Sequence, residues 1–213
     1  MILLTGFEPF GGESTNPSWS AAREAAARLR AEGLDARAVE LPCVFGEAIR
    51  VLDAALDHYG PDLVVCAGQA GGRPRISLER IAINCDDARI PDNAGNSPVD
   101  QTVVIGGPAA YFSTLPVKAA LAALLAAGIP AEVSQTAGTY VCNHLFYGLM
   151  HALRHRPGTR GGFVHVPYEP AQLPPGSNQP SLTLECMTDA LAAVVRTTLG
   201  TTADLKIAAG ATH

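Results

Sequence analysis

The stretch S-Q-T-A-G-T-Y-V-C-N-H-L-F-Y, residues 134–147, contains the change from strand to helix around which the predicted fold is organised. Residues 131–136 have the composition of a short buried strand, Gly138 indicates a turn, and Val141 begins a helical pattern. Cys142 then lies at the start of a helix, where backbone N–H groups and the helix dipole favour the nucleophilic thiolate. The alternative is a small buried core residue, which is the commoner state of a free cysteine.

Predicted strands and helices alternate on both sides of this stretch. Apolar runs of strand length cover residues 2–5, 36–41, 63–67, 76–84 and 162–166. Apolar residues recur at helical spacing over residues 19–29, 45–59, 116–127, 141–153 and 184–199. The continuous apolar run at 63–67 is typical of a strand that is covered on both faces. The sequence therefore predicts an α/β protein, and its 213 residues suffice for one such domain or for two small ones.

The composition argues against several classes of partner and site. A formal net charge of -5 gives no basic surface for nucleic acid, and no apolar run approaches the roughly 18 residues of a membrane span. The first residues carry no cationic segment ahead of Glu8, so we expect no signal peptide and a cytoplasmic location. The five cysteines are scattered and form no C-x-x-C pair, which fits a reducing compartment without disulfides or a zinc site.

Two glycine-rich segments follow predicted strands. The first, G-F-E-P-F-G-G at residues 6–12, lacks the G-x-G-x-x-G pattern and a P-loop lysine, which argues against phosphate binding. Phe7 and Phe10 can instead form an apolar wall for a ligand, or they can simply hold the loop against the core. The second, G-Q-A-G-G-R-P-R at residues 68–75, lies at the carboxyl end of a strand, the edge of an α/β sheet where ligands collect.

Residues 76–84 are predicted to form one strand, in which period-two spacing places Glu79 on the same face as Ile81 and Ile83. Because a carboxylate on an apolar face costs free energy unless it is paired, Glu79 should have a specific partner. The alternative is an edge strand whose glutamate points to water. The irregular segment that follows, residues 85–107, contains aspartates but lacks the spacing of a calcium-binding loop.

His165 lies one residue before the end of the strand predicted at residues 162–166, close to where the turn before Cys142 would lie. His144 cannot pair with Cys142, because two residues along a helix correspond to a rotation of about 200°. Cys142, His165 and Glu79 can supply the nucleophile, the proton carrier and the orienting carboxylate of a cysteine hydrolase. A strand histidine taken alone is more often structural, so the residues by themselves leave this triad open.

Several longer motifs occur in an order that resembles one known family. They are G-F-E-P-F-G-G, N-P-S (16–18), G-Q-A-G-G-R, L-E-R-I-A-I-N (78–84), A-R-I-P-D-N (88–93), G-G-P-A-A-Y-F (106–112), T-A-G-T-Y-V-C-N-H-L-F-Y-G (136–148) and G-F-V-H-V-P-Y (162–168). From residue 2 to about residue 169 the chain resembles pyroglutamyl peptidase type I, also called pyrrolidone-carboxylate peptidase. The resemblance is weaker after the proline-rich segment that follows.

The resemblance implies a cytoplasmic cysteine peptidase, without cofactor or metal, that removes N-terminal pyroglutamate (5-oxoproline) from peptides through a thioester acyl-enzyme. It implies that Cys142, His165 and Glu79 are the catalytic residues, and that Arg89 and Asp92 support the active site. One departure is Tyr140, because many members of the family carry Phe before Val-Cys. This difference concerns fine substrate preference.

The resemblance also implies the architecture. The expected fold is a single α/β/α sandwich domain over residues 1–213, with a mostly parallel twisted sheet and helices on both faces. A flexible loop at about residues 168–180 and a C-terminal helix at about residues 184–199 complete it, and homodimers or homotetramers are the expected assemblies.

A pocket for pyroglutamate should be apolar with one hydrogen-bond donor and one acceptor, because the ligand is a compact, uncharged lactam. Gln69, by side chain or backbone, and Asn16 are candidates for bonding the lactam N–H and C=O. The backbone N–H of Cys142 can meet the oxyanion with Arg89 assisting. The residues expected to form the walls are Phe7, Phe10, Ile90, Tyr140 and Val141.

Two other functions compete with this interpretation. One is a Cys-His-Glu amidohydrolase similar to glutamine amidotransferases, although Asn143-His144 replaces the small residues expected after such a nucleophile. The other is a small-molecule-binding α/β protein in which Cys142 is inert. A catalytically silent relative would be expected to lack part of the Cys, His and Glu set, which is intact here.

Overall fold

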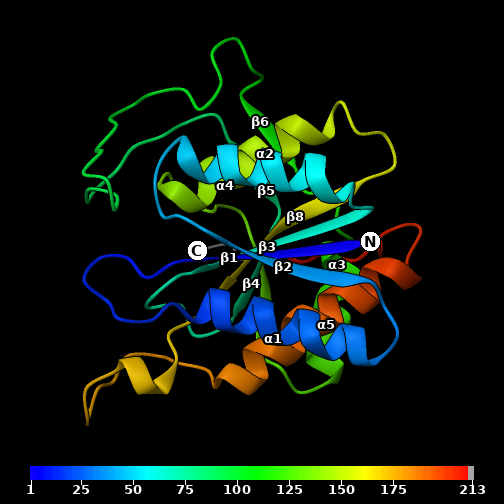
Figure 1. The fold of residues 1–213 in the computed structure, drawn as a ribbon. Helices are drawn as coiled ribbons and strands as arrows, with labels where there is room; N and C mark the ends of the chain where they lie inside the picture. Colours follow the sequence, from blue (N-terminus) through cyan, green and yellow to red (C-terminus); the bar gives the residue numbers. More distant parts are fainter. Residues whose placement is uncertain (211–213) are drawn as a thin grey trace.

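The computed structural model describes residues 1–210, which form a central six-stranded sheet between two layers of helices (Figure 1). The strands occur in the order β2-β1-β3-β8-β4-β7. Their bounds are β1 Ile2–Phe7, β2 Ala36–Leu41, β3 Leu63–Gln69, β4 Ile76–Glu79, β7 Ala131–Ser134 and β8 Arg160–Val166. Neighbouring strands are parallel except β4 and β8, which are antiparallel. The predicted α/β fold with a mostly parallel sheet is confirmed.

Helices cover both faces of this sheet. On one face lie α1 (Pro17–Ala31), α3 (Val117–Ala126) and α5 (Leu184–Gly200), and on the other lie α2 (Glu47–Tyr59) and α4 (Val141–Leu153) (Figure 1). Each layer encloses its own cluster of buried apolar side chains. No helix among the described residues is both long enough and apolar enough to cross a membrane.

The central strand β3 contributes to both apolar clusters. Val65 and Ala67 pack in the cluster beneath α1, α3 and α5, whereas Val64 and Cys66 pack in the cluster beneath α2 and α4. Alternate side chains of a strand point to opposite faces, so both sets must be apolar when both faces are covered. This is the physical reason for the continuous apolar run in the sequence.

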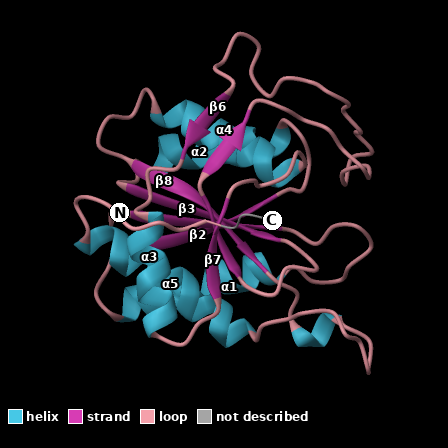
Figure 2. Cartoon of the chain, turned by 180° about the vertical axis from the view of Figure 1, so that it is seen from behind, coloured by secondary structure: helices cyan, strands magenta, loops and turns pink. Residues whose placement is uncertain are grey.

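The prediction of one strand over residues 76–84 is wrong. The chain breaks at Arg80 into β4 and a short strand β5 (Ile81–Ile83), which pairs antiparallel with β6 (Ala110–Phe112) in a separate sheet. In Figure 2, β6 is drawn across α2 and α4 and apart from the strands of the main sheet, and β5 and β6 both contact α4. Glu79 therefore does not share a sheet face with Ile81 and Ile83. Its neighbour at period two is Ser77, which is also buried.

The segment predicted as a flexible loop contains ordered structure beside the sheet edge. A short 3-10 helix, η1 (Pro170–Gln172), begins it, and Tyr168 and Ser181 form an isolated β-bridge. The Nε2 group of Gln172 donates to Oε1 of Gln69 at 3.0 Å and to the carbonyl oxygen of Thr15 at 3.3 Å. These contacts tie the start of the loop to β3 and to the segment before α1.

Candidate active site

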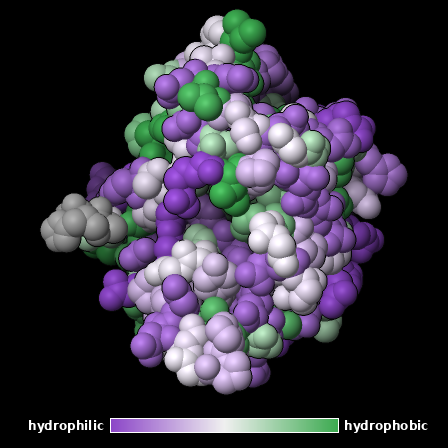
Figure 3. Space-filling model, turned by 90° about the vertical axis from the view of Figure 1, so that its left-hand side faces the viewer, coloured by the Kyte–Doolittle hydropathy of each residue, from purple (hydrophilic) through white to green (hydrophobic). Residues whose placement is uncertain are grey.

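A cavity of about 450 Å³ lies where β1, β3 and β8 end. Figure 3 faces this edge of the sheet and shows a hollow that is surrounded by both hydrophilic and hydrophobic residues. Parallel strands bring their carboxyl ends to one edge, so residues distant in sequence meet there. The cavity is lined by Phe7, Phe10, Cys43, Gln69, Ala70, Gly71, Arg73, Asp87, Arg89, Ile90, Ala137, Gly138, Thr139, Tyr140, Cys142, His165 and Tyr168.

Cys142 occupies the second position of α4, as the sequence predicted, and its sulfur lies against the end of β3. A Cβ atom added to Gly68 would lie 2.8 Å from the Cys142 Sγ and 2.8 Å from Cζ of Phe163. Gly68 is in turn the register partner of His165 across the β3–β8 pair. The Cys142 sulfur and His165 are therefore both neighbours of Gly68, and both residues line the cavity.

His165 is oriented by Glu79. The Nδ1 atom of His165 lies 2.8 Å from Oε1 of Glu79, and both side chains are almost completely buried. A deprotonated carboxylate only accepts hydrogen bonds, so Nδ1 carries the proton and Nε2 is left with a lone pair. The geometry thus supplies the specific partner that the sequence predicted for Glu79.

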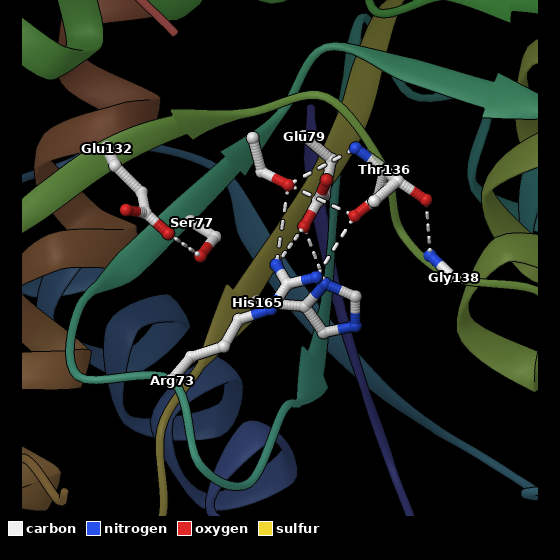
Figure 4. A network of polar contacts seen from close by, with 8 residues as sticks. Arg73, Ser77, Glu79, Glu132, Thr136, Gly138 and His165 are labelled. Atoms are coloured by element: carbon white, nitrogen blue, oxygen red, sulfur yellow. Dashed lines mark hydrogen bonds and ion pairs between the residues drawn. The ribbon is translucent and has the colours of Figure 1, made fainter. Parts of the chain in front are cut away.

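Arg73 joins this pair from the loop between β3 and β4. Its Nη1 donates to Oε1 of Glu79 at 2.6 Å, and its Nη2 donates to the carbonyl oxygen of Thr136 at 3.0 Å. Figure 4 shows Arg73 and His165 converging on Glu79 beside Thr136. Sequence analysis missed Arg73 as a site residue, because its only signal was an arginine in a glycine-rich loop at a strand end.

Burial dominates the acidity of the nucleophile. It raises the pKa of the Cys142 thiol well above its usual range, although the nearby Arg73 guanidinium acts in the opposite direction. A helix N-terminus stabilises an anion by only about 0.3–1 kcal/mol, whereas burial can raise a pKa by about 3–5 units. Burial therefore acts against the thiolate that the helix start favours, and the thiolate at Cys142 stays a prediction.

Comparison with known proteins assigns the chain to a family. The family model described as pyroglutamyl peptidase matches residues 1–200. The chain belongs to this family. A pyrrolidone-carboxylate peptidase of Klebsiella pneumoniae is 53% identical, and one of Streptomyces coelicolor is 55% identical, and each alignment covers 100% of this chain and 99% of the relative.

Solved structures of pyroglutamyl peptidases have the same fold. The pyroglutamyl peptidase I of Bacillus amyloliquefaciens is 48% identical and superposes with a TM-score of 0.89, over 96% of this chain and 98% of that one. The pyrrolidone carboxyl peptidase of Thermococcus litoralis is 37% identical, also with a TM-score of 0.89, over 97% and 98%. Membership of the pyroglutamyl peptidase family makes this protein a hydrolase, a cysteine peptidase that removes N-terminal pyroglutamate.

Most wall residues predicted for a pyroglutamyl peptidase pocket line the cavity, namely Phe7, Phe10, Gln69, Ile90 and Tyr140, together with Arg89. Arg89 is exposed at the cavity wall. The ring of Tyr140 packs against those of Phe10 and Phe45, with centroids 6.2 and 5.4 Å away, and its hydroxyl donates to the Pro91 carbonyl at 3.0 Å. The hydroxyl that distinguishes Tyr140 from phenylalanine therefore holds the loop that carries Ile90.

Asn16 and Val141 lie outside the cavity lining, which corrects their predicted place in the pocket. The Asn16 side chain caps α1: Oδ1 accepts from the backbone N–H of Ser18 at 3.1 Å, and Nδ2 donates to the Glu8 carbonyl at 2.9 Å. Its polar atoms are thus already bonded within the protein. Val141 is fully buried in the cluster beneath α2 and α4, because the first turn of α4 directs it into the core.

Asp92 supports the cavity from behind rather than lining it. Its carboxylate accepts hydrogen bonds from the backbone N–H groups of Phe45, Ala94 and Asn96, and from the Asn96 side chain. These bonds lower the pKa of the Asp92 carboxyl group, although burial opposes them as the largest single influence. The carboxylate fixes the loop after Arg89 to the segment that begins α2.

A second histidine–carboxylate pair lies beneath the site and was not anticipated from the sequence. His144 Nδ1 lies 2.8 Å from Oδ2 of Asp86, and His144 Nε2 accepts from the backbone N–H of Gly46 at 2.9 Å. Because both ring nitrogens are bonded within the protein, His144 has no free site for proton transfer. The prediction that His144 cannot pair with Cys142 is confirmed.

We predict that Gly68→Ala lowers kcat by about 100-fold, because the new Cβ must displace the Cys142 sulfur or the Phe163 ring, and ångström-scale misplacement costs about that much. Gly161→Ala is the matched control. It adds a Cβ 2.8 Å from Cδ1 of Leu153, in the same apolar layer but outside the cavity lining. Both variants should lose about 1–3 kcal/mol of stability in urea unfolding. Equal kcat values for the two variants would contradict the assigned role of Gly68.

Proposed function

We propose that this protein cleaves the amide bond after an N-terminal pyroglutamate with Cys142 as nucleophile, His165 as proton carrier and Glu79 as the carboxylate that orients His165. The observation that carries this proposal is the 2.8 Å contact between His165 Nδ1 and buried Glu79, in the same cavity as the Cys142 sulfur. The Cys142 proton passes to His165 Nε2 as Sγ bonds to the acyl carbon.

The remaining steps release both products and return the enzyme to its starting state. His165 Nε2–H protonates the leaving amine as the C–N bond breaks, which leaves a pyroglutamyl thioester on Cys142. A water molecule then gives a proton to Nε2 and attacks the thioester carbon. Pyroglutamate leaves as the sulfur recovers the proton from His165. Glu79 accepts no proton in these steps, and its carboxylate holds the imidazolium of His165 in place during both proton transfers.

The start of α4 provides a donor for the oxyanion. The first backbone hydrogen bond within this helix runs from the N–H of His144 to the carbonyl oxygen of Tyr140 at 3.1 Å. The N–H of Cys142 precedes it and is not used by the helix, so it is free to donate to the developing negative charge. We propose that Arg89, exposed at the cavity wall, assists.

We propose that the Gln69 side chain donates a hydrogen bond to the substrate in the cavity. Oε1 of Gln172 accepts from the backbone N–H of Glu169 at 2.9 Å, which fixes the orientation of the Gln172 amide. Its Nε2 must then donate, and the acceptor is Oε1 of Gln69 at 3.0 Å. The Nε2 group of Gln69 is left for the lactam C=O, between walls formed by Phe7, Phe10, Tyr140 and Ile90.

We predict that an amide of pyroglutamate releases its fluorophore with a kcat/KM about 10⁴-fold above that of the prolyl amide. Proline lacks the lactam C=O and leaves the Gln69 donor unpaired. Gln69→Leu should lower pyroglutamyl turnover and narrow this ratio, while Gln179→Leu, at an exposed position between η1 and α5, should change neither. A glutamyl amide serves as the open-chain control. Equal turnover of the pyroglutamyl and prolyl amides would contradict the proposed pocket.

The remaining parts of the proposal concern the molecule as a whole. We propose a single domain over residues 1–213 that acts in the cytoplasm without nucleic-acid or membrane partners, and the five free thiols and the net charge of -5 support this. We further propose a homodimer or homotetramer. Large apolar side chains exposed on the excursion between β5 and α3, namely Val99, Ile105 and Phe112, support self-association.

A further inference from the structure

Arg73 makes contacts that a solvated surface arginine does not make. Its side chain is only 28% exposed, and it reaches the Glu79 carboxylate, the Ser134 hydroxyl oxygen at 3.4 Å and the Thr136 carbonyl. Arg75, two residues further along the same loop, is 56% exposed and approaches only Glu132, at 3.6 Å. The two arginines share a loop and a charge, but only Arg73 reaches the site.

Both donors to Glu79 act on the same oxygen. His165 Nδ1 and Arg73 Nη1 both contact Oε1, whereas Oε2 is buried and has no hydrogen-bond partner among the described residues. If Arg73 were absent, the carboxylate would be a buried charge held by the imidazole alone and free to rotate. An unpaired buried charge is unfavourable, so the Arg73 contact stabilises the ionised carboxylate in its working orientation.

The other contacts of Arg73 reach the segment that leads to the nucleophile. Ser134 ends β7, and Thr136 lies six residues before Cys142. The Ser134 hydroxyl also donates to the Thr136 carbonyl at 3.0 Å, so this carbonyl accepts from two side chains. One guanidinium group thus bonds the Glu79 carboxylate, which in turn holds His165, and also bonds the backbone that leads to α4 (Figure 4).

We infer that Arg73 is a positioning residue of the catalytic apparatus, which fixes the Glu79 carboxylate on His165 and couples both to the segment preceding Cys142. This inference rests on the proposed roles of Cys142, His165 and Glu79. A planar guanidinium can bond several acceptors in a fixed arrangement, whereas the ammonium of lysine acts as a compact point charge. Arg73 also brings positive charge close to the sulfur.

Several charged and titratable groups besides Arg73 surround the Cys142 sulfur, so a test must separate the effect of Arg73 from theirs. Arg73 favours the thiolate, whereas Glu79, Cys43 and Cys66 oppose it, and burial has the largest effect. Other such groups that line the cavity are Asp87, Arg89, Tyr140, His165 and Tyr168. Cys43 is only 3% exposed whereas Cys142 is partly exposed at the cavity wall, so Cys43 should react more slowly with alkylating reagents. Peptide mapping of the alkylated protein distinguishes the two thiols that line the cavity.

The test compares Arg73→Met and Arg73→Lys with the matched control Arg75→Met. We expect Arg73→Met to lower kcat about 100-fold with KM changed less than threefold, Arg73→Lys to lose about tenfold, and Arg75→Met to match the unmodified enzyme. The pH at which Cys142 is half-maximally reactive toward iodoacetamide should rise by about one unit in Arg73→Met, because a neighbouring cation is lost.

The outcomes distinguish a positioning role of Arg73 from a purely structural one. A loss of kcat with no shift in the alkylation profile would reduce Arg73 to a structural residue and overturn the inference, as would a full rate in Arg73→Met or an equal loss in Arg75→Met. Alkylation needs no substrate. If the profile shifts but the unmodified protein cleaves no pyroglutamyl amide, the proposed function fails while the coupling of Arg73 to the thiol stands.

Discussion

Cys142→Ser should abolish cleavage of a pyroglutamyl amide, with a loss on the order of 10⁴-fold or more in kcat. A serine hydroxyl is a far weaker nucleophile than a thiol when the only base is a neutral imidazole. The fold should survive, because the substitution changes one atom at a partly exposed position on the cavity wall. Fluorophore release measures the rate, and thermal unfolding followed by circular dichroism measures the fold.

The matched control for this variant is Cys186→Ser. Cys186 is also a partly buried thiol near the start of a helix, but it lies on α5 against the opposite apolar cluster. Its substitution should leave kcat and KM unchanged. Turnover by Cys142→Ser close to that of the unmodified enzyme would remove Cys142 from the mechanism, whatever its family resemblance.

His165→Asn should lower kcat by about 10³- to 10⁴-fold, because asparagine can still donate to Glu79 but cannot carry a proton between the sulfur and the leaving amine. The burial that raises the pKa of the Cys142 thiol makes this loss severe, since the sulfur depends on a neighbouring base to become nucleophilic. Steady-state kinetics on the pyroglutamyl amide provides the measurement. Glu79→Gln should lose less, because an orienting group contributes less than the proton carrier.

His144→Asn provides the contrast for His165→Asn. His144 is the other buried histidine paired with a carboxylate, but both of its nitrogens are bonded to Asp86 and Gly46. Its replacement should lower the thermal midpoint and leave kcat within about tenfold at low temperature. If the two variants lost activity equally, the distinction between the catalytic pair and the structural pair would not hold.

Sequence patterns could predict the features that depend on local chemistry. The apolar periodicity of α4 and the turn at Gly138 located Cys142 at a helix start, and the buried run of β3 located the sheet edge that carries the cavity. Glu79 was expected to have a partner because a buried carboxylate requires one. The structure supplies His165 and Arg73 in that place.

The features that the sequence could not predict depend on tertiary contacts. The strand break at Arg80 follows from pairing: β4 joins the main sheet, whereas β5 pairs with a segment about thirty residues away. Arg73 bonds Thr136, 63 positions along the chain, and no local pattern indicates that contact. Burial around Cys142 acts against the thiolate that the helix terminus favours, and no local sequence pattern indicated this opposing effect.

Two residues show how one sequence signal supports two interpretations. Asn16 of the N-P-S motif was expected to contact the ligand, whereas in the structure its side chain caps α1. Val141 adjoins the nucleophile, but one step along a helix turns a side chain by about 100°, which directs Val141 into the core. Adjacency in sequence therefore did not make it a wall residue.

The most direct test of the central claim is mass spectrometry of the enzyme, quenched in acid within milliseconds of mixing with an activated pyroglutamyl ester. A good leaving group makes acylation faster than hydrolysis, so the intermediate accumulates. The account predicts one pyroglutamyl group per chain, labile to hydroxylamine and mapped to the peptide that contains Cys142. Continued turnover with no adduct, or an adduct on Cys43 or another side chain in place of Cys142, would contradict it.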